Sequence, residues 1–182
     1  LGVFAALRPT SKAAAKYGSG PVAKFSAFTL ALAVPFVGLL FNLPWFLFSL
    51  FIYGVLSSIH DLSINAHAAA LENRAGKRVM STFHAMWSIG GLTGGAIGGL
   101  LASANVSILF HAIGVGIFIV LVAFATRNWF LPADADQHVI EKHKKRKTPR
   151  KFVILGLLGL CGALGEGAAS DWGGVLARDT YE

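Results

Sequence analysis

Residues 107–126 read SILFHAIGVGIFIVLVAFAT, a run that contains no Asp, Glu, Lys or Arg. An α-helix rises about 1.5 Å per residue, so about 20 apolar residues span the ~30 Å hydrocarbon core of a bilayer. Inside that core every backbone N–H and C=O must find its partner within the chain, and a helix meets this requirement. The stretch therefore predicts a helix that crosses a membrane.

Four further stretches have the same apolar character and a similar length: 22–41, 44–70, 82–103 and 152–177. Residues 1–7 look like the tail of an earlier helix. Hydrophobic residues make up 54% of the chain and charged residues only 14%, whereas soluble domains carry about a quarter charged residues. We therefore expect an all-α membrane protein.

The positive charge of the chain lies between the apolar stretches, and the formal net charge is +7. The connections 8–24, 72–80 and 127–151 are rich in Lys and Arg, whereas 42–44 and 104–106 carry no charge. Cytoplasmic loops of membrane proteins carry an excess of Lys and Arg, and here every second connection does. We expect a multi-pass protein of the cell (plasma or inner) membrane, with the three basic connections in the cytoplasm. Charge confined to loops argues against a nucleic-acid partner.

The connection 127–151 is the longest, and its acidic start precedes a run of Lys and Arg. We interpret it as a linker between helical bundles. On this interpretation residues 1–127 form an N-terminal bundle, 128–151 are the basic cytoplasmic linker, and 152–182 hold the first helix of a C-terminal bundle. A solvated segment that only fixes orientation is the alternative, and contact of its cations with the lipid bilayer is compatible with both.

Polar residues interrupt the stretch 44–70. At about 100° per residue, Asp61 and Asn65 share a stripe of the predicted helix, and His60 and His67 form a second line beside it. Polar groups on a membrane helix face other helices or water, because lipid cannot satisfy them. Asp61 is therefore a candidate proton acceptor or ion-pair partner in a cavity wall, and Asn65 and His60 are further candidates. Bracing of neighbouring backbone, or a purely structural histidine, is the alternative.

The same stripe continues to Glu72, near the end of the apolar stretch. Arg74 and Arg78 follow it in the basic connection. We expect the Glu72 carboxylate to form an ion pair with one of these two arginines.

Glycines recur at helical spacing in the stretch 82–103 and form two overlapping GxxxG ladders on adjacent ridges. Without side chains, two helix backbones approach closely and gain van der Waals contact. We predict a helix-packing role for this glycine ladder and, as a second use, sliding against a neighbour. Its members are Gly90, Gly91, Gly94, Gly95, Gly98 and Gly99.

Two acids stand inside the stretch 152–177. Glu166 lies near its middle, and Asp171 with Trp172 lies nearer its end. An acid in hydrocarbon costs at least roughly 2.5 kcal/mol, so it normally faces protein or water. Membrane helices interrupted by glycine often mark binding sites, as this one is. We expect Glu166, Asp171 and Trp172 on a substrate or proton pathway, with Trp172 either stacked on substrate or at the membrane interface.

These basic loops, the long central loop and the polar span before it resemble the major facilitator superfamily. The resemblance implies a 12-helix transporter fold, of which residues 1–7 are the stub of helix two and the complete spans are helices three to seven. The remaining C-terminal helices of the same chain would then follow residue 182. The glycine ladder is similar to the fifth-helix motif of antiporters, although that motif has proline where Gly95 stands. A bacterial branch distantly similar to fucose-type sugar/proton symporters is indicated by His60-Asp61 through Asn65, Glu72-Asn73-Arg74, and Gly165-Glu166-Gly167 with Ser170-Asp171-Trp172.

The resemblance implies secondary active transport of a small solute by alternating access, coupled to protons through Asp61 and Glu166. A coupling proton would be the only cofactor, with no metal. Efflux of a drug or metabolite by antiport is the alternative, and a membrane sensor that transports nothing is a further one. An intramembrane enzyme is disfavoured, because His60 and His67 are too far apart to bind a metal from adjacent turns and no zinc or nucleophile motif appears.

Overall fold

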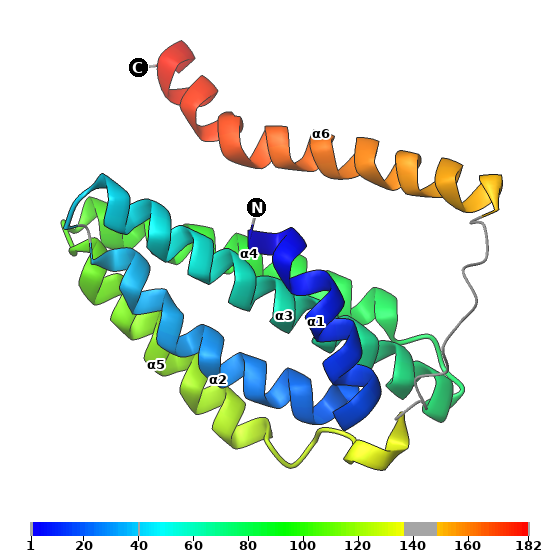
Figure 1. Ribbon diagram of the computed structural model, residues 1–182. Helices are drawn as coiled ribbons and strands as arrows, with labels where there is room; N and C mark the ends of the chain where they lie inside the picture. Colours follow the sequence, from blue (N-terminus) through cyan, green and yellow to red (C-terminus); the bar gives the residue numbers. More distant parts are fainter. Residues whose placement is uncertain (1, 40, 137–148, 182) are drawn as a thin grey trace. The chain divides into compact units, whose positions relative to one another are not determined.

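The computed structural model describes residues 2–39, 41–136 and 149–181, and every regular element within these ranges is a helix (Figure 1). The all-α class expected from the apolar stretches is confirmed. The elements in chain order are α1 (Gly2–Tyr17), α2 (Ser19–Gly38), α3 (Leu43–Ala75), α4 (Met80–Ser103), α5 (Ile108–Thr126), the short 3-10 helix η1 (Ala133–Ala135) and α6 (Arg150–Tyr181).

The chain divides into two compact units, Leu1–Ile140 and Glu141–Glu182. The first unit contains α1 to α5 and η1, and the second contains α6. The described residues 128–136, expected to begin the linker, therefore lie with the first unit. The predicted assignment of the units to two bundles stays a prediction, and most of the basic run lies outside the described residues.

The open loop expected at 8–24 is wrong, because α1 continues to Tyr17 and α2 begins at Ser19. The segment is rich in alanine and lysine, which are strong helix formers. Lys16 also lies in the last turn of α1, where positive charge complements the helix dipole. Only Gly18 interrupts the two helices, with a φ of 83° that glycine adopts at little cost. The connection 72–80 is shorter than expected for a related reason, since α3 extends to Ala75.

Local side-chain chemistry explains the other helix ends. Asn42 Oδ1 accepts a hydrogen bond from Trp45 N (2.8 Å) and so caps the start of α3. Ser107 caps the start of α5 in the same way. α3 ends at Ala75 and is capped by Gly76, whose φ of 61° is left-handed and whose N–H donates to Glu72 O in the last turn. These caps keep the connections between the long helices short.

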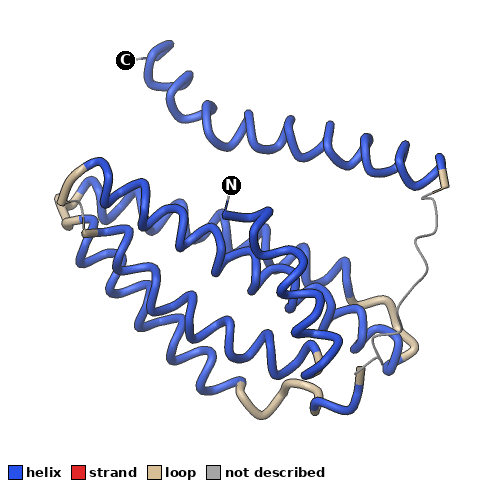
Figure 2. The backbone as a smooth tube through the Cα atoms, in the orientation of Figure 1, coloured by secondary structure: helices blue, strands red, loops and turns tan. Residues whose placement is uncertain are grey.

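Helix α2 is the centre of the first unit, because it contacts α1, α3, α5 and η1 (Figure 2). Association of helices in lipid depends on close van der Waals packing rather than on the hydrophobic effect, so small residues are favoured where helices meet. The buried residues of α2 are all small. They are Ser19, Gly20, Ala23, Ser26, Ala27, Ala31, Ala33 and Gly38.

Helix α5 approaches the backbone of α2 at glycine. A Cβ atom added to Gly116 would lie 2.8 Å from Ala31 O and 3.3 Å from Pro35 Cγ. One added to Gly38 would lie 3.0 Å from Leu109 Cα. Non-bonded carbon atoms prefer about 3.5–4.0 Å, so the observed separation of α2 and α5 requires glycine at position 116.

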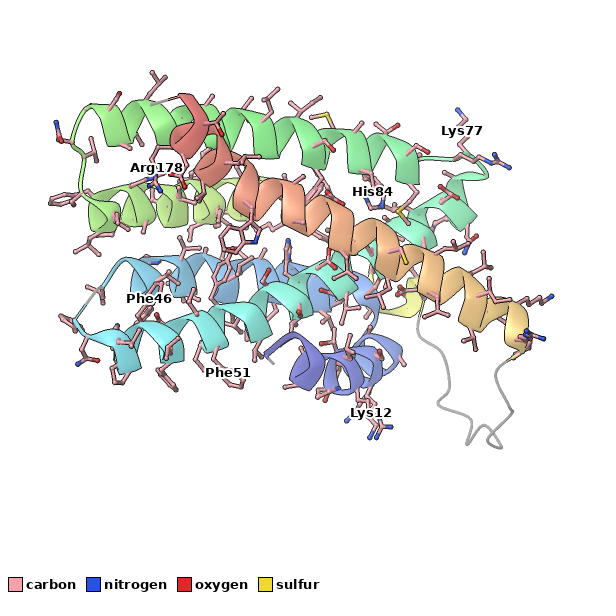
Figure 3. All side chains as sticks on the ribbon, turned by 90° about the horizontal axis from the view of Figure 1, so that it is seen from above. Lys12, Phe46, Phe51, Lys77, His84 and Arg178 are labelled. Atoms are coloured by element: carbon pink, nitrogen blue, oxygen red, sulfur yellow. The ribbon has the colours of Figure 1, made fainter. Side chains whose placement is uncertain are left out.

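Five helices in the described part of the chain are long and apolar enough to cross a membrane: α2, α3, α4, α5 and α6. Their number agrees with the sequence prediction. Many large apolar side chains on them are exposed, Leu100 and Phe118 among them, as lipid-facing residues would be. Within the first unit, Lys12 and Lys77 lie toward one end of the helices and Phe46 toward the other (Figure 3).

Gly116→Val is expected to lower the melting temperature of the full-length protein in detergent, because the new side chain would collide with α2. Overpacking of this kind costs about 1–3 kcal/mol. Gly114→Val is the matched control, since a Cβ at Gly114 meets nothing within 4 Å in the described structure. Equal melting temperatures for the two variants, measured by intrinsic fluorescence, would contradict the close α2–α5 contact.

Candidate functional site

Both histidines of α3 lie against serines of α2. His60 Nδ1 is 3.0 Å from Ser26 Oγ, and His67 Nδ1 is 3.3 Å from Ser19 Oγ. Ser63 Oγ lies 3.3 Å from Ser26 Oγ. The three hydroxyls and the His67 ring are buried, with at most 4% of any of these residues exposed. We call these five residues the Ser–His seam.

The seam follows from matched spacing on two antiparallel helices. Ser19 and Ser26 are seven residues apart, as are His60 and His67, and seven residues rise about 10.5 Å along a helix. Both Ser–His pairs therefore meet at once. Ser26 Oγ also donates to Ala23 O (2.8 Å), and which atom donates between Ser26 Oγ and His60 Nδ1 depends on the tautomer of the ring. The described contacts of His60 are thus those of helix packing, and its role in a substrate or proton pathway stays a prediction.

Asp61 and Asn65 are brought together on another face of α3. Asn65 Nδ2 donates to the backbone oxygen of Asp61 (2.9 Å) and to its Oδ1 (3.0 Å). The Asp61 side chain is exposed and Asn65 is half-buried. Polar residues of α3 therefore divide into two groups: histidines that bind α2, and an Asp–Asn pair that leaves a carboxylate accessible.

Glu72 caps the next helix. Its Oε2 accepts hydrogen bonds from Val79 N (2.9 Å) and Met80 N (3.0 Å), at the start of α4. α4 has no side-chain cap from its own N-cap residue, so Glu72 supplies an acceptor and a negative charge where the helix dipole favours them. The expected ion pair with Arg74 or Arg78 does not form among the described residues. The free N–H groups of α4 compete successfully for the carboxylate.

The glycine ladder of α4 lies on an open surface of the described structure. A Cβ added to Gly90, Gly91, Gly94, Gly95 or Gly99 would meet nothing within 4 Å, and one added to Gly98 would lie 3.5 Å from His111 Cε1 of α5. The predicted packing role of the ladder stays a prediction, because its partner is not among the described contacts. The close helix packing of the first unit occurs instead at the small residues of α2.

The candidates on α6 belong to the second unit. Glu166 and Trp172 are exposed on that helix, Trp172 by 69%. The Asp171 side chain lies outside the described residues. The pathway roles of all three stay predictions.

Two hollows lie in the first unit. A cavity of about 800 Å³ between α1, α3, the start of α2 and η1 is lined by alanines and by the polar residues Ser11, Ser19, Asn73, Arg74 and Asp136 among others. A second cavity of about 290 Å³ lies between α2, α3 and α5 and is mostly apolar. Asp61 and Asn65 line neither of them. Within the described ranges, no three His, Cys, Asp or Glu side chains could together hold a metal ion.

Sequence reasoning missed the serines of the seam. Ser19 lies in the predicted connection 8–24, Ser26 in the stretch 22–41 and Ser63 in the stretch 44–70, and none of them belongs to a motif. The available signal was the seven-residue spacing of the α2 serines, which equals that of His60 and His67. The spacing becomes informative only once α2 and α3 are known to run antiparallel and in this register.

Two curated proteins are similar to the chain over nearly its whole length. An uncharacterized transporter of Sinorhizobium fredii is 28% identical over 186 residues, which cover 98% of this chain and 48% of that protein. An uncharacterized MFS-type transporter of Yersinia pestis is 27% identical over 182 residues, which cover 97% of this chain and 45% of that protein. The resemblance to the major facilitator superfamily is confirmed.

The chain spans about half the length of these curated relatives. No protein-family model matches it, and no solved structure does. Together with the five apolar helices, the similarity to transporters of the major facilitator superfamily indicates a multi-pass membrane protein. The finer likeness to fucose-type symporters stays a prediction.

Ser26→Ala is expected to destabilise the contact of α2 with α3, because it removes the hydroxyl that hydrogen-bonds to His60 Nδ1. Interhelical hydrogen bonds of membrane proteins contribute about 0.6 kcal/mol on average and up to about 1.7, so the free energy of unfolding should fall by about 1 kcal/mol. Thr93→Ala is the control, since the exposed Thr93 hydroxyl bonds only within α4. If denaturant unfolding shows no larger loss for Ser26→Ala than for Thr93→Ala, the seam does not stabilise the unit.

Glu72→Ala removes the acceptor at the start of α4 and should cost about 0.5–2 kcal/mol, as loss of a helix cap does. Arg78→Ala should be close to neutral, because Arg78 is exposed and forms no ion pair among the described residues. Denaturant unfolding of both variants separates the two accounts of Glu72. Equal losses for the two would favour the ion pair over the cap.

Proposed function

We propose that the full-length protein is a secondary active transporter that moves a small solute by alternating access and couples this movement to protons. The observation that carries the proposal is Asp61, an accessible carboxylate on a helix of membrane length. A carboxylate costs free energy inside a bilayer, and one on a membrane-spanning helix normally has a functional role. The curated relatives are both named transporters, which supports transport as that role.

The surroundings of Asp61 suit a proton carrier. Asn65 holds Oδ1 with a neutral amide donor (3.0 Å), which orients the carboxylate without supplying a positive charge. No cation forms an ion pair with Asp61 among the described residues. On this proposal Asp61 exchanges its proton as the site opens to either side.

Glu166 is the second proposed carrier. It stands on the membrane-length helix α6, whose apolar neighbours Leu164 and Leu160 are exposed as lipid- or protein-facing residues would be. In transporters of related design, substrate and coupling ions bind near the middle of the membrane between helix bundles, and rocking of the bundles opens the site alternately. On this proposal Asp61 belongs to the first bundle and Glu166 to the second.

Import together with protons follows from the predicted likeness to fucose-type symporters. Efflux in exchange for protons is the second candidate, because the glycine ladder of α4 resembles the antiporter motif. The two differ only in the direction in which solute and proton move relative to each other. The same experiment therefore decides between them.

The test uses the full-length protein in proteoliposomes that contain a pH-sensitive dye, with a panel of sugars and other small solutes. The wild-type protein should move protons when its solute is added, inward with the solute for symport and outward for antiport. Asp61→Asn and Glu166→Gln keep size and shape but remove the charge. We expect both to abolish accumulation driven by a pH gradient while solute exchange at equal pH persists.

Asp134→Asn is the matched control, because Asp134 is an exposed carboxylate in η1, outside the membrane-length helices. It should accumulate solute as the wild type does. If Asp61→Asn and Glu166→Gln both retain accumulation that depends on the pH gradient, neither acid is the proton carrier. If no solute in the panel moves protons through the wild-type protein, coupling to protons is rejected for that panel.

A further inference from the structure

The segment that follows α5 turns back onto the junction of α1 and α2. The Phe130 and Asp136 side chains both contact the helices there. The Phe130 ring lies 5.1 Å from the His67 ring, centroid to centroid. Asp136 accepts a hydrogen bond from Ser19 N, at 3.1 Å from Oδ1 and 3.3 Å from Oδ2. We call residues 130–136 the strap.

Glycine makes room for the backbone of the strap. A Cβ added to Gly18 would lie 2.5 Å from Ala133 O, and one added to Gly20 would collide with Leu131 O. Both glycines are buried. The strap is therefore seated in a notch that only glycine can provide, on either side of Ser19.

Ser19 connects the strap to the helices. Its N–H is the first donor of α2 and has no side-chain acceptor from the N-cap residue Gly18. Asp136, which is 117 positions further along the chain, supplies that acceptor. The Ser19 hydroxyl meets His67 (3.3 Å), whose ring faces Phe130. Both ends of the strap thus depend on one pair of residues, Ser19 and His67.

We propose that the strap and its notch form a clasp that stays closed, so that the connection toward α6 leaves the first unit at Asp136 and not at the end of α5. A backbone residue spans at most about 3.3–3.6 Å. Moving the exit point from Arg127 to Asp136 therefore removes about 30 Å from the greatest reach of the connection. The clasp therefore shortens the length of free chain after the first unit, and this does not depend on which solute is moved.

Cysteine labelling measures whether the clasp is closed. Native cysteines of the full-length protein, Cys161 among them, are replaced by serine, and one cysteine is placed at Ala133 or at Asp134. Ala133 is half-buried in the notch and Asp134 is exposed. In detergent, a water-soluble maleimide should react slowly at position 133 and rapidly at position 134. Equal rates at the two positions would overturn the proposal.

Opening the clasp should change only the labelling rate at position 133. Asp136→Ala should raise the rate at position 133 about tenfold, a factor that loss of a hydrogen bond to a charged group produces, and should leave position 134 unchanged. An unchanged rate at 133 would show that Asp136 does not hold the strap.

Substitution of Ser19 removes the same hydrogen bond at its donor, and a second substitution at that position is the control. Ser19→Pro removes the N–H at the first position of α2, where proline suits a helix, whereas Ser19→Ala removes only the hydroxyl. Labelling at position 133 should be faster with Ser19→Pro than with Ser19→Ala. In the Ser19→Pro background, Asp136→Ala should not raise this labelling rate further, because the bond is already lost. Independent, additive effects would overturn the proposed pairing of Asp136 with Ser19.

Whether the clasp stays closed is tested in proteoliposomes. The rate at position 133 should be the same with and without a pH gradient, and a gradient that raises it would show that the clasp opens during the cycle. These rates require no transported solute. A failure of the proposed transport function therefore leaves the test of the clasp intact.

Discussion

The close packing of α2 against its neighbours is the constraint on which the first unit depends. Its buried face carries no residue larger than alanine or serine, so α3 and α5 reach its backbone directly. In lipid, the hydrophobic effect does not favour the association of apolar helices. Contact therefore comes from backbone proximity, at Gly116 above all, and from the few hydrogen bonds that such proximity permits.

The polar chemistry of α3 is arranged around this constraint. His60 and His67 are satisfied by serines that lie deep in the α2 contact, and a longer residue at either serine would hold the helices apart. Asp61 lies beside these histidines in sequence yet outside the contact. The helix thus separates residues that hold the unit together from a carboxylate that stays exposed. The same junction of α1 and α2 seats the strap, so one small-residue surface organises both the helices and the connection that leaves them.

Much of the fold could be predicted, because helices of membrane length are local features. Lengths of apolar residues near the bilayer thickness predict five spans, and Asn42 and Ser107 are recognisable caps. The loop predicted at 8–24 is wrong because charged residues do not by themselves end a helix, and lysine and alanine here continue the helices beyond the apolar stretch. In the candidate site, the pairing of Asp61 with Asn65 follows from a spacing of four on one helix. The cap of α4 by Glu72 does not, because it requires the turn at Gly76 to bring the carboxylate back to Val79.

The sequence by itself determined the helical class, the number of spans and the stripe that carries Asp61, since each depends on residues near one another in the chain. Only the tertiary structure decided which small residues are packed and which are open. The α4 glycines form the more conspicuous motif, yet the described close contacts are made by the plainer α2. Partners such as Ser19 and Asp136 lie 117 residues apart, and no local pattern encodes their meeting. Their contact arises because α2, α3 and the end of α5 pack in one register, which is a property of all three segments together.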